Sequence, residues 1–373
     1  MPHDLRHPRL RVLADGFELP GVIFAEIVSN NHYAADRFRL QLEVRPVAAA
    51  QWSVTDSALL DIQVATDGPN WISLITGDVD QLRLDTRSHT MSLEGRDLTA
   101  GLIETRTQET FANQTSSEIA TTIAARHGLT ADVTRTMTPV GAYWQLEHDR
   151  ITLGSFSRAI TEWDLLVTLA QHEGYDVWVF GSTLFFRLAS SLPVAAATLR
   201  PVATLSGPAN IISMQLERAL TLARDIEVVV KSWNSRQANA FAQTARARRE
   251  GSSSHAVGVA GARSRIQRYV YVVPNLTPDA ALKLAQMRLA ELTRHERVVE
   301  IEMPGELTLA PRQKIRVEAT GTSFDQEYWI DEITRRIDVK HGFTQHLRAR
   351  NATVGSQSTT PADPIGGQTW NGF

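Results

Sequence analysis

Apolar and polar residues alternate along the first hundred residues of the chain. In "RFRLQLEV" the apolar Phe38, Leu40, Leu42 and Val44 are separated by charged or polar neighbours, and "LLDIQV" and "QLRLDT" repeat the pattern. A period of two places every second side chain on the same face of a strand. From about residue 9 to residue 96 the pattern therefore predicts a twisted antiparallel sheet or small barrel with one wet face.

The spacing changes to that of a helix in "TSSEIATTIAARHGL", residues 115–129. Thr115 and Glu118 can form a capping box, in which each side chain accepts a backbone N–H that the first turn leaves unpaired. The apolar residues between Ile119 and Ala124 form one stripe on a period of 3.6. Gly128 supplies the left-handed residue that ends many helices. The segment predicts one complete amphipathic helix.

A similar helix, "TEWDLLVTLAQHEGY", begins at Thr161, which is 46 residues after Thr115. The capping threonine, the acidic third residue, the apolar stripe and the final glycine all have counterparts. Many of these matches are ordinary features of any capped helix, so the alternatives are a true repeat or a chance resemblance. The next residues, "YDVWVFGSTLFFRL", predict two aromatic-rich strands joined by a hairpin turn at Gly181 and Ser182.

Strand patterns return in the last part of the chain, in "DIEVVVKSWN", "RVVEIEMPG", "QKIRVEAT", "EYWIDEITRRIDV" and "FTQHLRAR". Among them, "TPDAALKLAQMRLAELTRHE" predicts a helix over 277–296, with Thr277 as N-cap and Pro278 in the first turn. Residues 235–264 hold five arginines among serine, glycine and alanine and have no periodic apolar face. We expect them to leave the sheet as a long mobile loop, either solvated or ordered against a neighbouring subunit.

These patterns predict an α+β fold that is mainly β: two barrel-like antiparallel domains that flank a helical α/β middle with two repeated β-α-β units. After about residue 350 the chain is polar, rich in proline and glycine, and carries one aromatic hook, Trp370. The predicted domains are a first barrel (1–98), the middle domain (99–203), a second barrel (204–350) and a flexible C-terminal tail (351–373).

The composition is that of a globular protein. The 373 residues suffice for several domains, and 43% of them are hydrophobic and 21% charged. The sequence contains neither an apolar run of roughly 18 residues that could cross a bilayer nor the apolar core of a signal peptide. We therefore expect a soluble protein made in a cytoplasm. A chain without cysteine has no disulfides or thiolate zinc sites, and a net charge of −3 gives no reason to expect nucleic-acid binding.

No set of residues predicts a catalytic, metal or cofactor site. The phosphate-binding, nucleophile-elbow and dinucleotide glycine motifs are absent from the sequence. His341 and His346 are five apart on a predicted strand, so they point to opposite faces and cannot share a metal. His127 and His172 lie in the last turns of the two similar helices, where a partly positive imidazole complements the helix dipole. Glu118 and Asp164 are explained by capping rather than by hydrolysis of a glycan.

Several motifs resemble those of one known family. "GDVD" (77–80), "GRDL" (95–98), the strand around Tyr328 and "GFT" (342–344) are similar to the baseplate hub proteins of contractile phage tails. These are the late control D group and the Mu-like tail hubs, which are themselves similar to the N-terminal part of VgrG in type VI secretion. The likeness runs from about residue 10 to residue 350, which is most of the chain.

One position departs from the family pattern. Where the family has a Pro-Gly turn, this chain has Pro311 and Arg312. A type I turn needs no positive φ, so the replacement predicts a turn of that type here.

The resemblance implies a non-enzymatic homotrimer in which two barrel-like domains from each of three chains form a ring. Such a ring joins the six-fold tail tube to the three-fold spike, so the implied partners are the tube, spike and baseplate wedge proteins. The implied location is the virion tail baseplate, after assembly in the cytoplasm of the host bacterium. No cofactor is implied. The repeated helices would be packing modules on the outside of the ring.

Two groups of residues are candidates for partner contacts. Arg246, Arg248 and Arg249 lie in the arginine-rich segment, and Trp370 and Phe373 are aromatic residues of the predicted tail. We expect these five residues to lie in interfaces with partner proteins.

A second function stays open at this point. The repeated units are also similar to LysM modules, which bind peptidoglycan glycans, so a peptidoglycan-binding or cell-wall-degrading protein of the tail tip is the alternative. Glycan binding requires an exposed aromatic platform, for which Trp144 and Trp163 are the candidates. A third possibility is a factor that acts only during assembly inside the cell.

Overall fold

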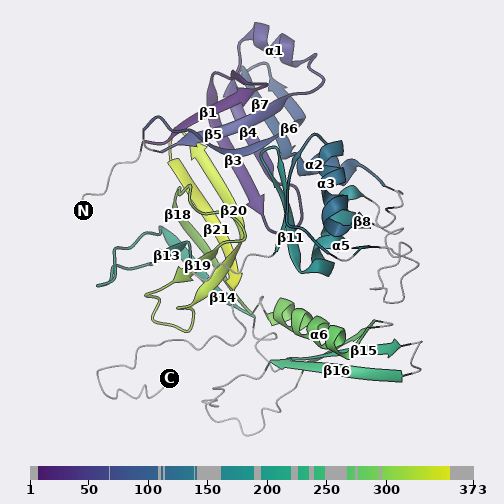
Figure 1. Ribbon diagram of the computed structural model, residues 1–373. Coiled ribbons are helices and arrows are strands. Elements are labelled where there is room, and N and C mark those ends of the chain that lie inside the picture. Colours follow the sequence, from purple (N-terminus) through teal and green to yellow (C-terminus); the bar gives the residue numbers. More distant parts are fainter. Residues whose placement is uncertain are drawn as a thin grey trace. The chain divides into compact units, whose positions relative to one another are not determined.

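The computed structural model confirms the predicted class, because strands dominate and helices are few among the described residues (Figure 1). Its residues separate into two compact units. The structure describes residues 7–66, 68–107, 111, 114–137, 139–140, 161–188, 195–219, 226–234, 239–247, 267–273, 276–293 and 296–352.

Unit 1 comprises Met1–Pro193, Pro304–Arg312 and Asp331–His346. Its main sheet is antiparallel and has the order β2-β1-β5-β6-β7-β4-β3-β20. The strands are β1 (Arg9–Ala14), β2 (Phe17–Glu18), β3 (Val22–Asn30), β4 (Arg37–Glu43), β5 (Leu59–Ala65), β6 (Ile72–Asp85), β7 (Thr90–Asp97) and β20 (Glu327–Asp338).

The predicted alternation of apolar residues is confirmed in this sheet. Along β4 every second residue is buried, and Phe38, Leu40 and Leu42 all join one core. The short helix α1 (Pro46–Trp52) packs its inward alanines and Trp52 against the same core. The period of two thus places one face of the sheet in the core and leaves the other face polar.

Two glycines of the family motifs let β6, β7 and β4 approach closely. A Cβ atom on Gly95 would lie 2.1 Å from the carbonyl oxygen of Asp78 and 2.4 Å from the Phe38 ring. A Cβ atom on Gly77 would lie 2.0 Å from the carbonyl oxygen of Arg96. No side chain fits at such distances, so glycine is required at both positions for steric reasons.

Two other residues of these motifs, Asp80 and Arg96, stabilise a β-bulge between β6 and β7. The pairing register shifts between Val79 and Gln81, which leaves Asp80 out of the ladder. The Asp80 carboxylate accepts hydrogen bonds of 2.6 and 2.8 Å from Arg96, whose guanidinium also pairs with Glu104 at 2.5 Å. The bulge is therefore held by a bidentate ion pair.

The middle of the chain folds as helices over a small sheet, also in unit 1 (Figure 1). The helices are α2 (Thr99–Glu104), α3 (Ser116–Arg126) and α5 (Glu162–Glu173). The strands are β8 (Gln114–Thr115), which pairs with β10 (Pro139–Val140), and β9 (Thr130–Val133), β11 (Tyr175–Phe180) and β12 (Thr183–Leu188), which form a second sheet. The hairpin predicted at Gly181 and Ser182 joins β11 to β12.

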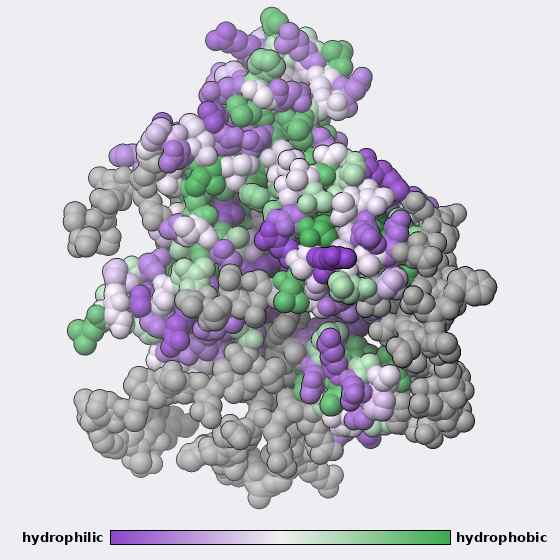
Figure 2. All heavy atoms as spheres, in the orientation of Figure 1, coloured by the Kyte–Doolittle hydropathy of each residue, from purple (hydrophilic) through white to green (hydrophobic). Residues whose placement is uncertain are grey.

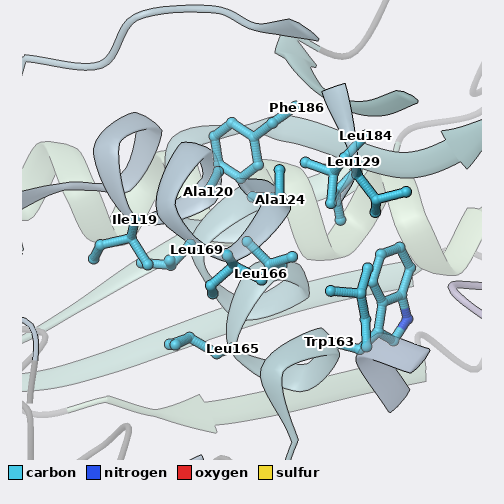
Figure 3. Packing of buried hydrophobic residues seen from close by; sticks show 14 of the residues in the cluster. Ile119, Ala120, Ala124, Leu129, Trp163, Leu165, Leu166, Leu169, Leu184 and Phe186 are labelled. Atoms are coloured by element: carbon cyan, nitrogen blue, oxygen red, sulfur yellow. The ribbon is translucent and has the colours of Figure 1, made fainter. Parts of the chain in front are cut away.

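Both predicted helices have the expected caps, and their stripes share one core. Thr115 and Glu118 form the capping box of α3, and Gly174 ends α5 with φ 73°. Figure 3 shows the Phe186 ring beside Ala120 and Ala124 in this core. The small alanines of α3 therefore leave room for the aromatic ring of β12.

A buried acidic residue links the two helices. Glu162, at the start of α5, is 1% exposed and pairs with both Arg126 and His127 at the end of α3. The Nε2 atom of His127 lies 2.6 Å from the Glu162 carboxylate. The His127 imidazole therefore contacts the neighbouring helix α5. The prediction considered only the dipole of α3 and missed this contact.

Unit 2 comprises Val194–Met303, Gln313–Ile330 and Leu347–Phe373. It contains β13 (Ala197–Leu199), β14 (Ser213–Arg218), β18 (Arg297–Pro304) and β19 (Lys314–Val317), and the unit boundaries fall within β20 and β21 (Gly342–Asn351). A separate sheet of β15 (Ile226–Asn234), β16 (Asn239–Ala247) and β17 (Gln267–Val272) carries α6 (Pro278–Thr293) on one face (Figure 1).

Two expectations for this region change. The loop expected over 235–264 contains a strand, because residues 239–247 form β16 and pair along their whole length with β15. The helix predicted over 277–296 is described as α6 over Pro278–Thr293, Glu296 lies outside it, and Thr277 caps it as expected. Residues 353–373 of the predicted tail lie outside the described residues, and the division into four domains stays a prediction.

The close approach at Gly95 predicts a large effect of a single methyl group. We expect Gly95→Ala to lower the free energy of unfolding by about 3 kcal/mol, because the Asp78 carbonyl cannot move away from the new Cβ atom without disrupting the strand pairing, and the Phe38 ring cannot move without disturbing the core. Gly101→Ala in α2 is the matched control, since its Cβ would lie 3.4 Å from the nearest atom. Chemical denaturation of both variants measures the difference; equal stabilities would contradict the steric account.

Candidate functional site: a buried polar joint

The loop between β3 and β4, residues 31–36, forms the centre of a polar cluster in unit 1. The Asp36 carboxylate accepts hydrogen bonds from the backbone N–H of Asn30 at 2.9 Å and from its side-chain amide at 3.1 Å. The Asn30 side chain in turn accepts the N–H of His32 at 2.9 Å. Side chains thus replace the strand ladder as partners of the loop backbone. We call residues 30–36 and their partners the joint.

Four other elements bind the backbone of the joint. The indole N–H of Trp163, from α5, donates to the Tyr33 carbonyl at 2.6 Å. The N–H of Asn31 donates to the Asp331 carbonyl of β20 at 2.7 Å, and that of Asp97 donates to the Asp36 carbonyl at 2.9 Å. The Arg312 guanidinium reaches the Asn30 carbonyl at 3.4 Å. The joint therefore connects the main sheet of unit 1 to its helical part.

Buried charge is concentrated at the same place. Burial raises the pKa of Asp97, which is 6% exposed, to about 8, and the nearby Asp36 carboxylate adds to this rise. Burial also raises the pKa of Asp36 to about 6, against the hydrogen bonds from Asn30 and Ser29 and the charges of Arg312 and Arg335. Every cause other than burial lowers the pKa of Asp36, whereas the Asp36 charge raises that of Asp97 further, so the rise is smaller at Asp36.

The buried cation of the joint is Arg335 on β20. This side chain is 5% exposed, and burial lowers its pKa to about 10 although Asp36 and Glu306 favour its charged form. Its guanidinium donates to the Leu309 carbonyl. Arg335 therefore joins the segment 304–312 to the sheet through one buried hydrogen bond and the attraction of two carboxylates.

The turn at Arg312 corrects a prediction. Its φ is +72°, so the type I turn predicted for Pro311 and Arg312 is wrong: the turn needs a positive φ although the residue is not glycine. The side chain supplies the compensation. Arg312 forms a 2.8 Å ion pair with Asp176 on β11, and its guanidinium lies 5.1 Å from the Trp178 ring centroid. These contacts offset the strain of the backbone.

A ladder of aromatic rings and arginines extends from this point across the β11–β12 hairpin. Trp178 and Phe185 stack with their centroids 4.9 Å apart and an interplanar angle of 8°. Arg187 lies 5.2 Å from the Phe185 ring and pairs with Asp132. The two rings thus interact with each other and with flanking arginines.

The residues predicted to contact partners are only partly described. Arg246 lies in β16, opposite Glu227 of β15 in the backbone register. Arg248, Arg249, Trp370 and Phe373 lie outside the described residues. Their roles stay predictions, and the residues of the joint were not among the candidates.

The two tryptophans considered for an aromatic glycan-binding platform do not form one among the described residues. Trp163 is 4% exposed and its indole N–H is used in the joint, so it offers no surface to a glycan. Trp144 lies outside the described residues. In the part of the chain that the structure describes, no three acidic or histidine side chains are placed to hold a metal ion. None of the described helices has the length and apolar character needed to cross a membrane.

The sequence matches no family model and no curated protein, but its structure resembles solved structures. A tail protein from Neisseria meningitidis MC58 superposes with a TM-score of 0.66 at 16% identity, over 93% of this chain and 97% of that chain. The 43 kDa tail protein of prophage MuSo2 from Shewanella oneidensis has the same TM-score and identity, over 92% and 98% of the two chains. The chain has the fold of phage tail proteins.

A chain of a PdpA-VgrG complex has a similar fold. A Francisella PdpA-VgrG complex matches with a TM-score of 0.52 at 7% identity, over 94% of this chain and 59% of that chain. The resemblance to tail hubs and VgrG that the motifs indicated is thus confirmed at the level of the fold. The similarity covers almost the whole chain, including both units.

The raised pKa of Asp97 predicts how the stability of the tail-protein fold depends on pH. Its pKa rises from an ordinary value of 3.8 to about 8 on folding, so the fold binds the proton more tightly than the unfolded chain. This contribution is complete below about pH 4 and is lost as the pH rises toward 8. Asp97→Asn keeps an acceptor for Thr99 but cannot ionise. We expect the free energy of unfolding to fall less steeply in the variant between pH 5 and 8, which leaves it about 3–4 kcal/mol more stable at pH 8 relative to pH 5 than the wild type. Parallel slopes in urea denaturation across this range would contradict the assignment.

Arg312 allows strain and contacts to be measured separately. Arg312→Ala loses the contacts with Asp176 and Trp178 but keeps a side chain at positive φ, and we expect a loss of about 2–3 kcal/mol. Arg312→Gly loses the same contacts and relieves the strain, so it should be about 1 kcal/mol more stable than the alanine variant. Thermal and urea unfolding of the pair test this; an alanine variant as stable as the wild type would show that the contacts contribute nothing.

Proposed function

We propose that the chain is a structural hub of a contractile phage tail or a related injection device. Three copies form a ring that joins the six-fold tail tube to the three-fold spike, with baseplate wedge proteins around it. The protein acts in the virion tail baseplate after assembly in the host cytoplasm, and it catalyses no reaction.

One observation carries this proposal: the fold similarity spans nearly the full length of two phage tail proteins as well as this chain. The similarity to a chain of a PdpA-VgrG complex supports a role in a related injection device. The motifs around Gly77 and Gly95, on which the resemblance to tail hubs rests, allow the paired strands β6 and β7 to approach closely.

The joint supports a mechanical role. Its carboxylates are hydrogen-bonded to Asn30 and Thr99, and Asp97 is buried. Such groups hold elements together instead of meeting a substrate in a cleft. A hub that transmits force between tube and spike needs this rigidity. Within the proposal, Arg246, Arg248, Arg249, Trp370 and Phe373 are contacts with partner proteins.

The proposal predicts the number and position of the chains in a tail. Tails purified from cells that produce the chain with an affinity tag should contain three copies each, which is half the number of subunits in one six-fold ring of the tube. Quantitative mass spectrometry against the tube protein measures the ratio, and gold labelling of the tag should mark only the baseplate end. Six or more copies, or label along the tail, would contradict the hub assignment.

A further inference from the structure

Two arginines of unit 1 contact one tryptophan ring on the outer face of its main sheet. Leu10 and Val12 of β1 pack on the core, so Arg9 and Arg11 point to the other face of the strand. The guanidinium carbon of Arg9 lies 5.2 Å from the centroid of the Trp71 ring, and that of Arg11 lies 4.4 Å from it. Both distances are those of attractive cation–π contacts. We call Arg9, Arg11 and Trp71 the basic face.

The register of the sheet brings these side chains together. Arg9 pairs with Ala65 of β5, and Val64 pairs with Ile72 of β6, so Trp71 lies beside Ala65 on the side away from Arg9. Ala65 carries only a methyl group and is 0% exposed, which agrees with its being covered by the two larger side chains. Hydrophilic side chains reach the surface around the start of β1 (Figure 2). The basic face is therefore built by strand pairing and lies at the surface.

The chain does not neutralise the two positive charges. Arg9 donates a hydrogen bond to the Gly68 carbonyl, and the Nε atom of Arg11 donates to the amide oxygen of Gln63 at 3.0 Å, so both acceptors are uncharged. The Gln63 amide in turn donates to Asp61, and it separates that carboxylate from Arg11. Within the described ranges, neither arginine forms an ion pair and neither Nη1 group has a hydrogen-bond partner. Charge and donors are thus available to a ligand.

The basic face has the chemistry of a carboxylate site. A guanidinium is planar and always charged, and it binds a carboxylate through N–H groups along its edge. A contact with the Trp71 ring restricts the guanidinium of each arginine while part of its edge stays free. Small molecules bind in concave pockets, whereas these side chains lie on the outer face of a sheet. The ligand that fits is therefore an acidic side chain on the surface of a protein.

A nucleic acid fits this face less well than a protein. Binding to a phosphate backbone requires many cations in a row, and the basic face offers two. The Asp61 carboxylate lies on the same face of the sheet, bonded to Gln63 and to Ser73 at 2.6 Å, and it repels a chain that carries a charge at every nucleotide. The net charge of −3 also opposes such a chain. One or two carboxylates can approach the arginines without meeting Asp61.

We infer that the basic face binds neighbouring Glu or Asp side chains of a partner protein. Arg9 and Arg11 contact the carboxylates, and Trp71 holds both guanidinium groups in position. The partner is a different protein with at least two acidic residues close together on its surface. This contact goes beyond the proposed function, because it depends neither on a ring of three chains nor on a place in a tail.

Binding of a hexaglutamate peptide to the full chain tests the inference. Fluorescence anisotropy of the labelled peptide at low ionic strength measures the dissociation constant, and Arg9→Gln with Arg11→Gln should raise it at least about tenfold. Arg11→Lys keeps the charge but loses the planar group, so it should weaken binding by a smaller factor. The matched control is Arg83→Gln with Arg87→Gln, which removes the same charge from exposed arginines. Arg83 also donates to a glutamine amide, that of Gln81 at 3.3 Å.

Each outcome supports or overturns the inference. Loss of peptide binding in the Arg9 and Arg11 variant alone, with thermal unfolding that shows a folded protein, supports it. A wild type that does not bind hexaglutamate, or a control variant that loses as much binding, overturns it. Tighter binding of an oligothymidylate than of hexaglutamate overturns the choice of a protein. A change in the oligomeric mass of the Arg9 and Arg11 variant, measured by light scattering, would assign the face to a second copy and also overturn it. The number of copies in a tail tests the proposed function separately.

Discussion

The hydrogen bonds between Asp36 and Asn30 are the interaction on which the structure of unit 1 depends. They hold the loop after β3 in a shape that presents the Tyr33 carbonyl to Trp163 and the Asp36 carbonyl to Asp97. Loops of this kind usually lie in solvent, where water satisfies the backbone. Here several backbone partners are protein groups, so the loop can bind helices and strands that are distant in the sequence.

The joint is stable although it concentrates charge. Asp97 is largely protonated at neutral pH, which follows from its raised pKa of about 8, and it therefore adds little repulsion to the negative charge of Asp36. Arg335 and Arg312 balance that charge from two other segments. This arrangement suits a scaffold protein, in which buried polar groups specify how elements meet and no substrate needs to reach them.

Local sequence patterns predicted most of the helices and strands, whereas the joint is formed by contacts between residues that are far apart in the sequence. The alternation through Phe38 and the capping box at Thr115 are local, and both are present. β16 has no apolar period that would have predicted a strand, and its backbone pairing with β15 is a contact between strands that the local pattern does not show. Arg335 occupies a buried position in the alternation of β20, which is a signal that sequence reading could have used. The positive φ of Arg312 depends on Asp176, 136 residues away, and no local rule predicts it.

Amide hydrogen exchange of the joint tests most directly whether it is a rigid connection within unit 1. The N–H groups of Asn31 and Asp97 are bonded to backbone carbonyl groups of the joint, so they should exchange at least about 100-fold more slowly than that of Ser88, which is bonded to Asp85 in an exposed turn. Residue-resolved exchange by NMR compares the three. Slow exchange at Asn31 and Asp97 is the predicted result. Exchange as fast as that of Ser88 would show that the loop opens freely, and the joint would not hold unit 1 together.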